Sequence, residues 1–146
     1  MSTMKRGFAR FSTRTGAWMY RKLDGRFVTF SKDVHVLMVT TPGRSTGLPR
    51  STCVRYLDSD DGFIVWGTGS GSRQDPDWFL NLRAAGTAEV QVRADRMRVR
   101  AREVVGAERD DMWNNVVLAQ APEVIKYANR AGRVIPVAVL EPIEDT

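Results

Sequence analysis

The 146-residue sequence contains one cysteine, Cys53, and one histidine, His35. A disulfide within the chain is therefore excluded, and one Cys with one His cannot form a Cys/His zinc site. A serine hydrolase would have to use His35 as its base, but His35 lies in an apolar, strand-like run, so we expect it to be a packing residue. Because the chain has few groups for difficult chemistry, an enzyme built on it would use a borrowed cofactor.

The sequence also lacks an apolar run of membrane-spanning length and a segment with signal-peptide form. This predicts a soluble, cytoplasmic protein. Hydrophobic residues nevertheless make up 42% of the chain, which is enough for the core of one domain. We find no internal repeat and no linker that would divide the chain further.

Acidic residues are scarce at the N-terminus, where residues 1–32 hold eight Lys and Arg side chains against a single acid, Asp24. The rest of the chain holds 14 basic and 16 acidic residues, so its charge is close to neutral. This distribution argues against a nucleic-acid-binding body. We divide the chain into a basic amphipathic N-terminal arm, residues 1–32, and a single domain, residues 33–146.

The arm has helical periodicity over residues 6–22, with aromatic residues on one side and arginines on another. Such a helix could lie on an anionic membrane surface, or it could pack its aromatic side on the domain. We favour packing, because one short helix gives only reversible membrane binding. The residues concerned are Phe8, Phe11, Thr15, Trp18 and Met19 on the first side, and Arg6, Arg10, Arg14 and Arg21 on the second.

A glycine-rich segment, residues 40–50, joins two strand-like runs. Gly43 and Gly47 allow the backbone to turn and to approach a ligand closely. Arg44 and Arg50 place a permanent positive charge on each side of the turn. Two guanidinium groups with nearby N–H donors suit a phosphate or a carboxylate. The alternative is a simple hairpin loop with solvated arginines, and the loop by itself does not decide between them.

Hydrophobic patterning predicts six strands, and their short connections favour antiparallel pairing in a small closed or nearly closed barrel. Pro136 predicts that the last strand lies at an edge or a bulge. Helices are expected after the start signal Asp75-Pro76-Asp77, in which Asp75 would cap the first turn and Pro76 would take the first helical position, over 107–119, and after Pro122. The first of these helices should end at Gly86. The expected strands cover residues 34–41, 51–57, 63–67, 87–93, 96–105 and 134–140.

Two further segments could bind anions. Residues 68–74 are rich in small side chains and precede a helix start, but such loops are more often flexible connections. The strand over 96–105 carries four alternating arginines, which we interpret as a solvated face rather than a polyanion site.

Four motifs in order resemble the deazaflavin-dependent nitroreductase family of split β-barrel flavin and deazaflavin oxidoreductases. They are Thr-Thr-x-Gly-Arg-x-x-Gly-x-x-Arg at 40–50, the helix start at 75–82, Val-Gln-Val at 90–92, and Arg-x-Ile-Pro-Val at 133–137. The resemblance covers about residues 17–142. It implies a mainly β fold with flanking helices, a six-stranded antiparallel split β-barrel of the FMN-binding type.

The resemblance also implies an enzyme that uses coenzyme F420, or alternatively FMN, and needs no metal. Reduced F420 would pass a hydride to a small electron-poor acceptor such as a quinone, a nitroaromatic or an enone. Tyr127 would line the substrate pocket as the catalytic candidate. The implied cofactor-binding residues are Arg44, Ser45, Thr46, Gly47 and Arg50 for the anionic tail, Thr52, Val54 and Arg55 along the ring, Trp66, Gly67, Thr68, Gly69 and Ser70 at its polar edge, and Trp78 and Asn81 closing the site.

Some positions depart from the family pattern. Ser45 stands where the family often has Lys, and of the tyrosines that often precede the last strand only Tyr127 is present. A non-enzymatic lipid, fatty-acid or flavin carrier on the same barrel is therefore the alternative function. Small split barrels often form dimers, which makes a homodimer an alternative to a monomer. If the N-terminal arm does bind a membrane, residues 6–22 would be the contact of a peripheral protein with its inner face.

Overall fold

The computed structural model describes residues 34–144. The predicted arm over 1–32, with its helix over 6–22, lies outside these residues. Within them, seven strands form one antiparallel sheet in the order β2-β1-β5-β6-β7-β4-β3. The strands are β1 (Val36–Pro42), β2 (Pro49–Arg55), β3 (Leu57–Ser59), β4 (Gly62–Trp66), β5 (Thr87–Val92), β6 (Asp95–Val104) and β7 (Val137–Pro142).

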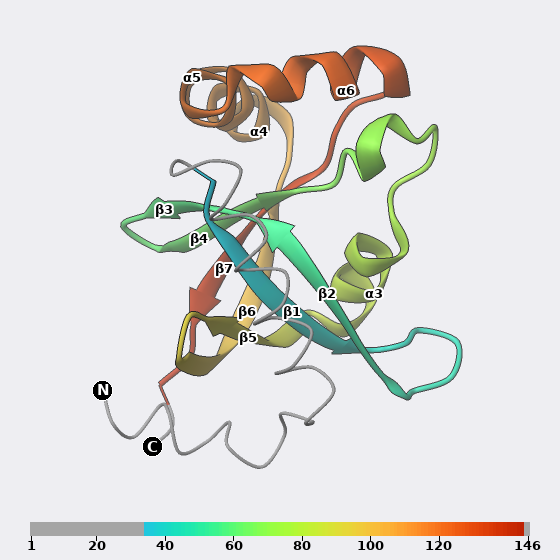
Figure 1. Ribbon diagram of the computed structural model, residues 1–146, viewed down its shortest axis with the longest axis vertical. Helices are drawn as coiled ribbons and strands as arrows, with labels where there is room; N and C mark the ends of the chain where they lie inside the picture. Colours follow the sequence, from blue (N-terminus) through green and yellow to red (C-terminus); the bar gives the residue numbers. More distant parts are fainter. Residues whose placement is uncertain (1–33, 145–146) are drawn as a thin grey trace.

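The predicted second strand, 51–57, is divided at Tyr56, which accounts for seven strands where six were expected. The residues before Tyr56 pair with β1, and those after it pair with β4. The two edge strands of the sheet are therefore consecutive in the chain, so the sheet curls strongly upon itself (Figure 1). Tyr56 N donates a hydrogen bond to His35 O (3.0 Å) at this bend.

His35 itself is exposed and precedes β1, so it is not the strand-embedded packing residue that we expected.

The strands β4 and β7 are apolar on both faces, because each face of this part of the sheet is buried in a hydrophobic cluster. Along β4, Ile64 belongs to the cluster under the C-terminal helices, whereas Val65 belongs to the cluster inside the curl. Val139 and Leu140 on β7 divide in the same way. Successive side chains of a strand point to opposite faces, so two buried faces require the continuous apolar runs seen in the sequence.

The helices lie in two places. Figure 1 shows α4, α5 and α6 together over one end of the curled sheet, and α3 beside β2. Phe79 and Leu82 of α3 are fully buried in the cluster inside the curl. The bounds are α3 (Asp77–Ala85), α4 (Gly106–Met112), α5 (Leu118–Gln120) and α6 (Ile125–Ala131), with a π-helical turn η2 (Trp113–Val117) and short 3-10 turns η1 (Gly69–Gly71) and η3 (Pro122–Val124).

Two local expectations need correction. Pro136 does not mark an edge: β7 begins after it, at Val137, and lies between β6 and β4. The proline is tolerated because it precedes the strand, where its missing N–H costs no ladder hydrogen bond. Asp75 does not cap α3; Pro76 occupies the N-cap position. The predicted helix end is confirmed, since Gly86 is left-handed (φ 75°) and its N–H donates to Leu82 O (2.9 Å).

Candidate functional site

The glycine-rich segment forms the loop between β1 and β2. Gly43 N donates to Leu48 O (2.8 Å), and Gly47 N donates to Gly43 O (2.7 Å). Gly47 has a φ of 75°, which favours glycine, and a Cβ on Gly43 would lie 2.9 Å from Thr46 Oγ1. Both glycines are therefore needed for this tight loop.

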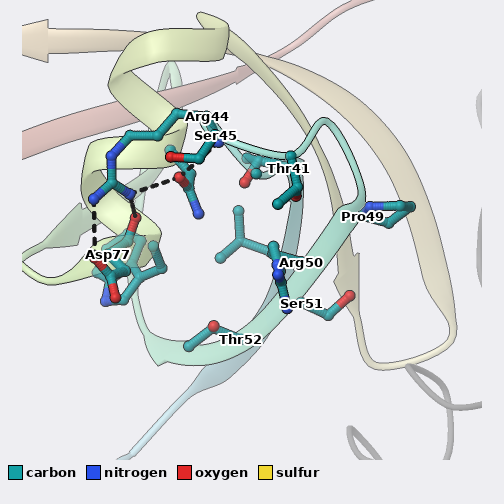
Figure 2. Close-up of a pocket in the computed structure, with 13 residues that line it drawn as sticks. Thr41, Arg44, Ser45, Pro49, Arg50, Ser51, Thr52 and Asp77 are labelled. Atoms are coloured by element: carbon teal, nitrogen blue, oxygen red, sulfur yellow. Dashed lines mark hydrogen bonds and ion pairs between the residues drawn. The ribbon is translucent and has the colours of Figure 1, made fainter.

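A cavity of about 710 Å³ opens between this loop, β2 and the first turns of α3 (Figure 2). Its volume lies within the usual range for small-molecule sites, about 300–1,000 Å³. Its walls carry two arginines and several hydroxyl groups, with few apolar side chains. The lining residues are Val39, Thr41, Gly43, Arg44, Ser45, Thr46, Pro49, Arg50, Ser51, Thr52, Asp77, Trp78 and Asn81.

Arg44 is held by α3. Its backbone N and its Nη1 both donate to Asn81 Oδ1 (3.1 and 2.8 Å), and Nη2 pairs with Asp77 Oδ1 (3.0 Å). Figure 2 shows this group of contacts at one side of the cavity. The charge of Arg44 is therefore largely balanced by Asp77, and the residue fastens the β1–β2 loop to the helix.

Arg50 has no such partners. It lies at the start of β2, lines the same cavity and is exposed. No hydrogen bond or ion pair joins it to another described residue. Of the two arginines that bracket the loop, Arg50 therefore offers the uncommitted positive charge. A guanidinium group in this state can form two parallel hydrogen bonds with a carboxylate or phosphate.

The structure brings together seven of the predicted site residues at this cavity. They come from two separate stretches of the chain, the β1–β2 loop with the start of β2, and α3. Six further residues line the cavity, of which only Gly43 was expected from the sequence to approach a ligand. The predicted group is Arg44, Ser45, Thr46, Arg50, Thr52, Trp78 and Asn81, and the additional group is Val39, Thr41, Gly43, Pro49, Ser51 and Asp77.

Part of this additional group had a signal in the sequence. Asp77 was singled out only as a helix-start residue, and its position in the first turn of α3 is what brings its carboxylate to the cavity. Thr41 lies within the predicted loop over 40–50 and Ser51 follows it, so both could have been added to the site on that ground. Val39 had no distinguishing feature among the apolar residues of its strand.

The other predicted contacts lie away from this cavity. Gly47 lines a smaller hollow of about 300 Å³ behind the same loop. Arg55 pairs with Glu123 (2.8 Å) and lies 6.0 Å from the ring centre of Trp66, which is buried under the C-terminal helices. Val54 packs against the cluster inside the curl.

The predicted loop over Gly67, Thr68, Gly69 and Ser70 runs between β4 and α3 and does not line the cavity either. Ser70 takes a left-handed conformation (φ 56°, ψ 29°) inside the short turn η1. A Cβ on Gly67 would lie 3.1–3.2 Å from side-chain atoms of Pro76, Phe79 and Pro136, so only glycine fits there comfortably.

Tyr127 is half-buried on α6 and does not line the cavity. Two cations lie near its ring, with Lys126 Nζ 5.1 Å and Arg130 Cζ 5.9 Å from the ring centre. The helix that carries Tyr127, α6, packs against η1 of the 67–71 loop.

Sequence reasoning did not give Arg133 a role beyond its place in a motif. Its guanidinium group reaches the loop that precedes α3 and donates to Gly67 O (3.1 Å) and Gln74 O (2.9 Å). These partners lie 66 and 59 residues away in the chain, so local patterning could not have identified them.

Over residues 34–144 we find no group of three or more His, Cys, Asp or Glu side chains that could hold a metal ion. In the same range, no helix combines the length and the apolar character needed to cross a bilayer. The donors that line the cavity are instead guanidinium, hydroxyl, amide and backbone N–H groups, which suit an organic anion.

Comparison with known proteins agrees with this assignment. A family model described as F420H2-dependent quinone reductase matches residues 12–142. An F420H2-dependent quinone reductase of Mycobacterium tuberculosis is 31% identical over 106 residues, which is 71% of this chain and 71% of the relative.

Solved structures show the same fold. An F420H2-dependent reductase, FDR-A, superposes with a TM-score of 0.64 at 25% identity over 73% of this chain and 93% of its own. A structure described as a domain-swapped dimer also superposes with a TM-score of 0.64, at 23% identity over 86% of this chain and 98% of its own. The chain therefore belongs to the F420H2-dependent quinone reductase family, a family of split-barrel oxidoreductases that use coenzyme F420.

Proposed function

We propose that this protein reduces quinones with F420H2, and that the coenzyme binds in the cavity between the β1–β2 loop, β2 and α3. The observation that carries the proposal is the uncommitted guanidinium group of Arg50 at the wall of this cavity. The coenzyme has a phosphodiester and carboxylates in its tail, and such groups suit an arginine fork with neighbouring N–H donors. The cavity thus fits the anionic part of the coenzyme.

The loop residues divide the work of binding the tail. Arg50 supplies the charge, and Ser45 and Thr46 supply hydroxyl and backbone donors, while Gly47, whose N–H is bonded to Gly43 O, keeps the loop in shape. Arg44 contributes by fastening the loop to α3 through Asn81 and Asp77, because its positive charge is already paired with Asp77.

The ring would lie further along β2, next to Thr52, Val54 and Arg55, with Trp78 and Asn81 of α3 closing the site. The segment from Trp66 to Ser70 is proposed as the contact for the polar edge of the ring.

When bound, the reduced coenzyme supplies a hydride. The chain itself holds the ring and the quinone together and keeps water out. A quinone oxygen gains negative charge as it is reduced, so a hydrogen-bond donor at that oxygen stabilises the transition state. We assign this donor to the phenol of Tyr127. A Tyr127→Phe variant tests the assignment, and we expect it to lower kcat and to leave the affinity for the coenzyme unchanged.

The proposal is tested by mixing purified protein with F420H2 and a soluble naphthoquinone and following coenzyme oxidation by absorbance. We expect turnover that depends on both protein and quinone. Arg50→Gln should weaken coenzyme binding, whereas Arg100→Gln, which removes an exposed arginine on β6 away from the cavity, should not. Absence of coenzyme binding to the wild-type protein, or a copurified acyl chain in native mass spectrometry with no turnover, would contradict the proposal.

Location and assembly belong to the same proposal. We place the protein in the cytoplasm, and we keep a reversible contact of residues 6–22 with the inner face of the membrane as the alternative to packing of this segment on the domain. The likeness to a domain-swapped dimer supports examining a homodimer. Flotation with anionic vesicles and light scattering measure these two properties, and we expect no retention on nucleic acid because the body is nearly neutral.

A further inference from the structure

Arg133 makes five side-chain hydrogen bonds, all of them to one loop. It lies between the end of α6 and the start of β7. Its three guanidinium nitrogens donate to four backbone carbonyls and one carboxylate of a single loop. The contacts are Nε to Ser72 O (3.1 Å), Nη1 to Asp75 Oδ1 (2.7 Å), and Nη2 to Gly67 O (3.1 Å), Thr68 O (3.2 Å) and Gln74 O (2.9 Å).

These contacts explain why arginine occupies the position. The loop over 67–75 contains only the short turn η1, so most of its carbonyls have no sheet or helix partner. A planar group with five N–H donors can satisfy several carbonyls at once, whereas lysine carries a compact charge with three donors. The side chain is only 16% exposed, and Asp75 balances its charge.

The loop leads directly into α3, which forms one wall of the cavity. Trp78 and Asn81 of this helix line the cavity, and Asn81 Oδ1 accepts the two hydrogen bonds from Arg44. Arg133 therefore fixes the start of α3, and α3 in turn fixes the β1–β2 loop. Arg133 itself does not line the cavity.

A second arginine strengthens this arrangement. Asp75 also accepts from Arg83 Nη2 (3.2 Å), and Arg83 pairs with Glu103 on β6 (2.7 Å). Arg83 belongs to the last turn of α3, so Asp75 is tied to the segment before β7 through Arg133 and, through Arg83, to the far end of α3 and to β6.

We infer that Arg133 is a positioning residue for hydride transfer, which orders the 67–75 loop and α3 so that Trp78, Asn81 and the β1–β2 loop are already placed when the coenzyme binds. This inference rests on the proposed coenzyme site. It differs from a role in binding, because the positive charge of Arg133 is used within the loop and does not reach the cavity.

The test compares Arg133→Gln with Arg109→Gln. Arg109 is a matched control: it is 13% exposed and donates Nε and Nη2 to one backbone carbonyl, Ile135 O (3.0 and 2.9 Å), but no hydrogen bond or ion pair joins it to the 67–75 loop. Arg133→Lys serves as the conservative variant. Thermal unfolding of all three variants separates loss of stability from loss of position.

Hydrogen exchange without coenzyme gives the first readout. We expect Arg133→Gln to speed amide exchange about tenfold or more, since several hydrogen bonds to a charged group are lost. The faster peptides should cover 67–82 and also the β1–β2 loop, 43–48. Arg109→Gln should leave both segments unchanged. Faster exchange confined to 67–75, or equal effects of the two variants, would overturn the inference.

Coenzyme binding gives the second readout. Arg133→Gln should raise the Kd for F420H2 about tenfold while leaving the dependence of Kd on salt as in the wild type, because no charge contact to the coenzyme is lost. Arg133→Lys should recover part of the affinity. A Kd within twofold of the wild type, or a salt dependence reduced as in Arg50→Gln, would refute positioning. If the wild-type protein does not bind F420H2, the proposed function fails, and the exchange comparison still decides the role of Arg133.

Discussion

Arg44 lies in the β1–β2 loop and Arg50 lies six residues later, at the start of β2. Their surroundings give the two side chains different roles. Arg44 is bonded to Asn81 and Asp77, whereas Arg50 has no partner among the described residues. A charged hydrogen bond to a bound anion contributes about 1.5–3 kcal/mol, whereas an exposed ion pair such as Arg44–Asp77 contributes little. The difference between the two residues should therefore be measurable in binding.

We expect Arg50→Gln to raise the Kd for the coenzyme about tenfold to a hundredfold. The variant should also lower the dependence of binding on salt, since one charge contact is removed. Titration of intrinsic fluorescence at several salt concentrations measures both effects.

Arg44→Gln should instead act through the loop. It should weaken binding with little change in the salt dependence, and it should speed amide exchange over 43–48. If the two variants gave the same salt dependence, the division between a binding and a holding arginine would be wrong.

Glu89 on β5 is an acidic residue in an unfavourable place. Its Oε2 atom is buried and has no hydrogen-bond partner among the described residues. Burial raises the pKa of Glu89 to about 8, against the opposing effect of Arg98 and Arg96 on the neighbouring strand. The folded protein therefore keeps a proton on this group at pH values where the unfolded chain, with a pKa near 4.5, has lost it.

The sign of the effect on stability follows from proton counts. Between pH 4.5 and about 8 the folded state binds more protons at Glu89 than the unfolded state, so this group makes stability fall as pH rises. We expect Glu89→Gln to remove this fall in stability with rising pH, because glutamine does not titrate. The free energy of unfolding of the variant relative to the wild type should improve by at least about 1.4 kcal/mol from pH 5 to pH 8.5, the equivalent of one pKa unit. Urea unfolding at both pH values checks this, and a difference that does not change with pH would contradict it.

At the scale of single elements, two glycines with positive φ mark a turn and a helix end. Gly62 (φ 147°) lies at the start of β4, where a Cβ would overlap Leu140 O on β7. Gly86 (φ 75°) ends α3, and a Cβ there would meet no atom within 4 Å. The backbone strain is shared by both positions, but the steric conflict is present only at Gly62.

Gly62→Ala should therefore destabilise the protein much more than Gly86→Ala. We expect about 1 kcal/mol for Gly86→Ala from the left-handed conformation alone. For Gly62→Ala we expect at least about 3 kcal/mol, because strain and overpacking add. Chemical denaturation of the two variants gives the comparison, and equal losses would show that the β3–β4 turn can move away from β7.

The helix α3 illustrates how an element receives its position from distant parts of the chain. Its start signal, Pro76-Asp77, was visible in the sequence, and so was its end at Gly86. The sequence did not reveal that Asp75 forms ion pairs with Arg133 and Arg83 instead of capping the helix. A local motif therefore predicted the element but gave the wrong task to one of its residues.

At the scale of the whole molecule, one sheet is shared by two hydrophobic clusters. β4 and β7 contribute alternate residues to the cluster inside the curl and to the cluster under α4, η2 and α6. Loss of either cluster would expose one face of the same strands. The two clusters should therefore unfold together.

We expect Leu37→Ala, at a fully buried position on β1, to cost about 2–5 kcal/mol. Ile125→Ala, at an exposed position on α6, should change stability by no more than about 0.5 kcal/mol. Unfolding of Leu37→Ala should give the same midpoint by circular dichroism and by tryptophan fluorescence, to which Trp113 of the other cluster contributes. Two separated transitions would show that the clusters are independent units.

The sequence by itself determined the strands, the turn residues and the family, because these depend on local periodicity and on motifs such as 40–50. It predicted a nearly closed antiparallel barrel, and only the bend at Tyr56 and the place of β7 differed. Seven of the predicted contacts also meet at one cavity, because two strands joined by a short loop must lie side by side.

Only the tertiary structure decided which charges are free. Arg44 meets Asn81 from 37 residues away, and Arg133 meets Gly67 from 66 residues away. Such partners depend on how the sheet curls and where α3 is placed, and no local pattern encodes them. The chemical type of the site was therefore readable from the sequence, whereas the separate tasks of Arg44, Arg50 and Arg133 follow from the folded geometry.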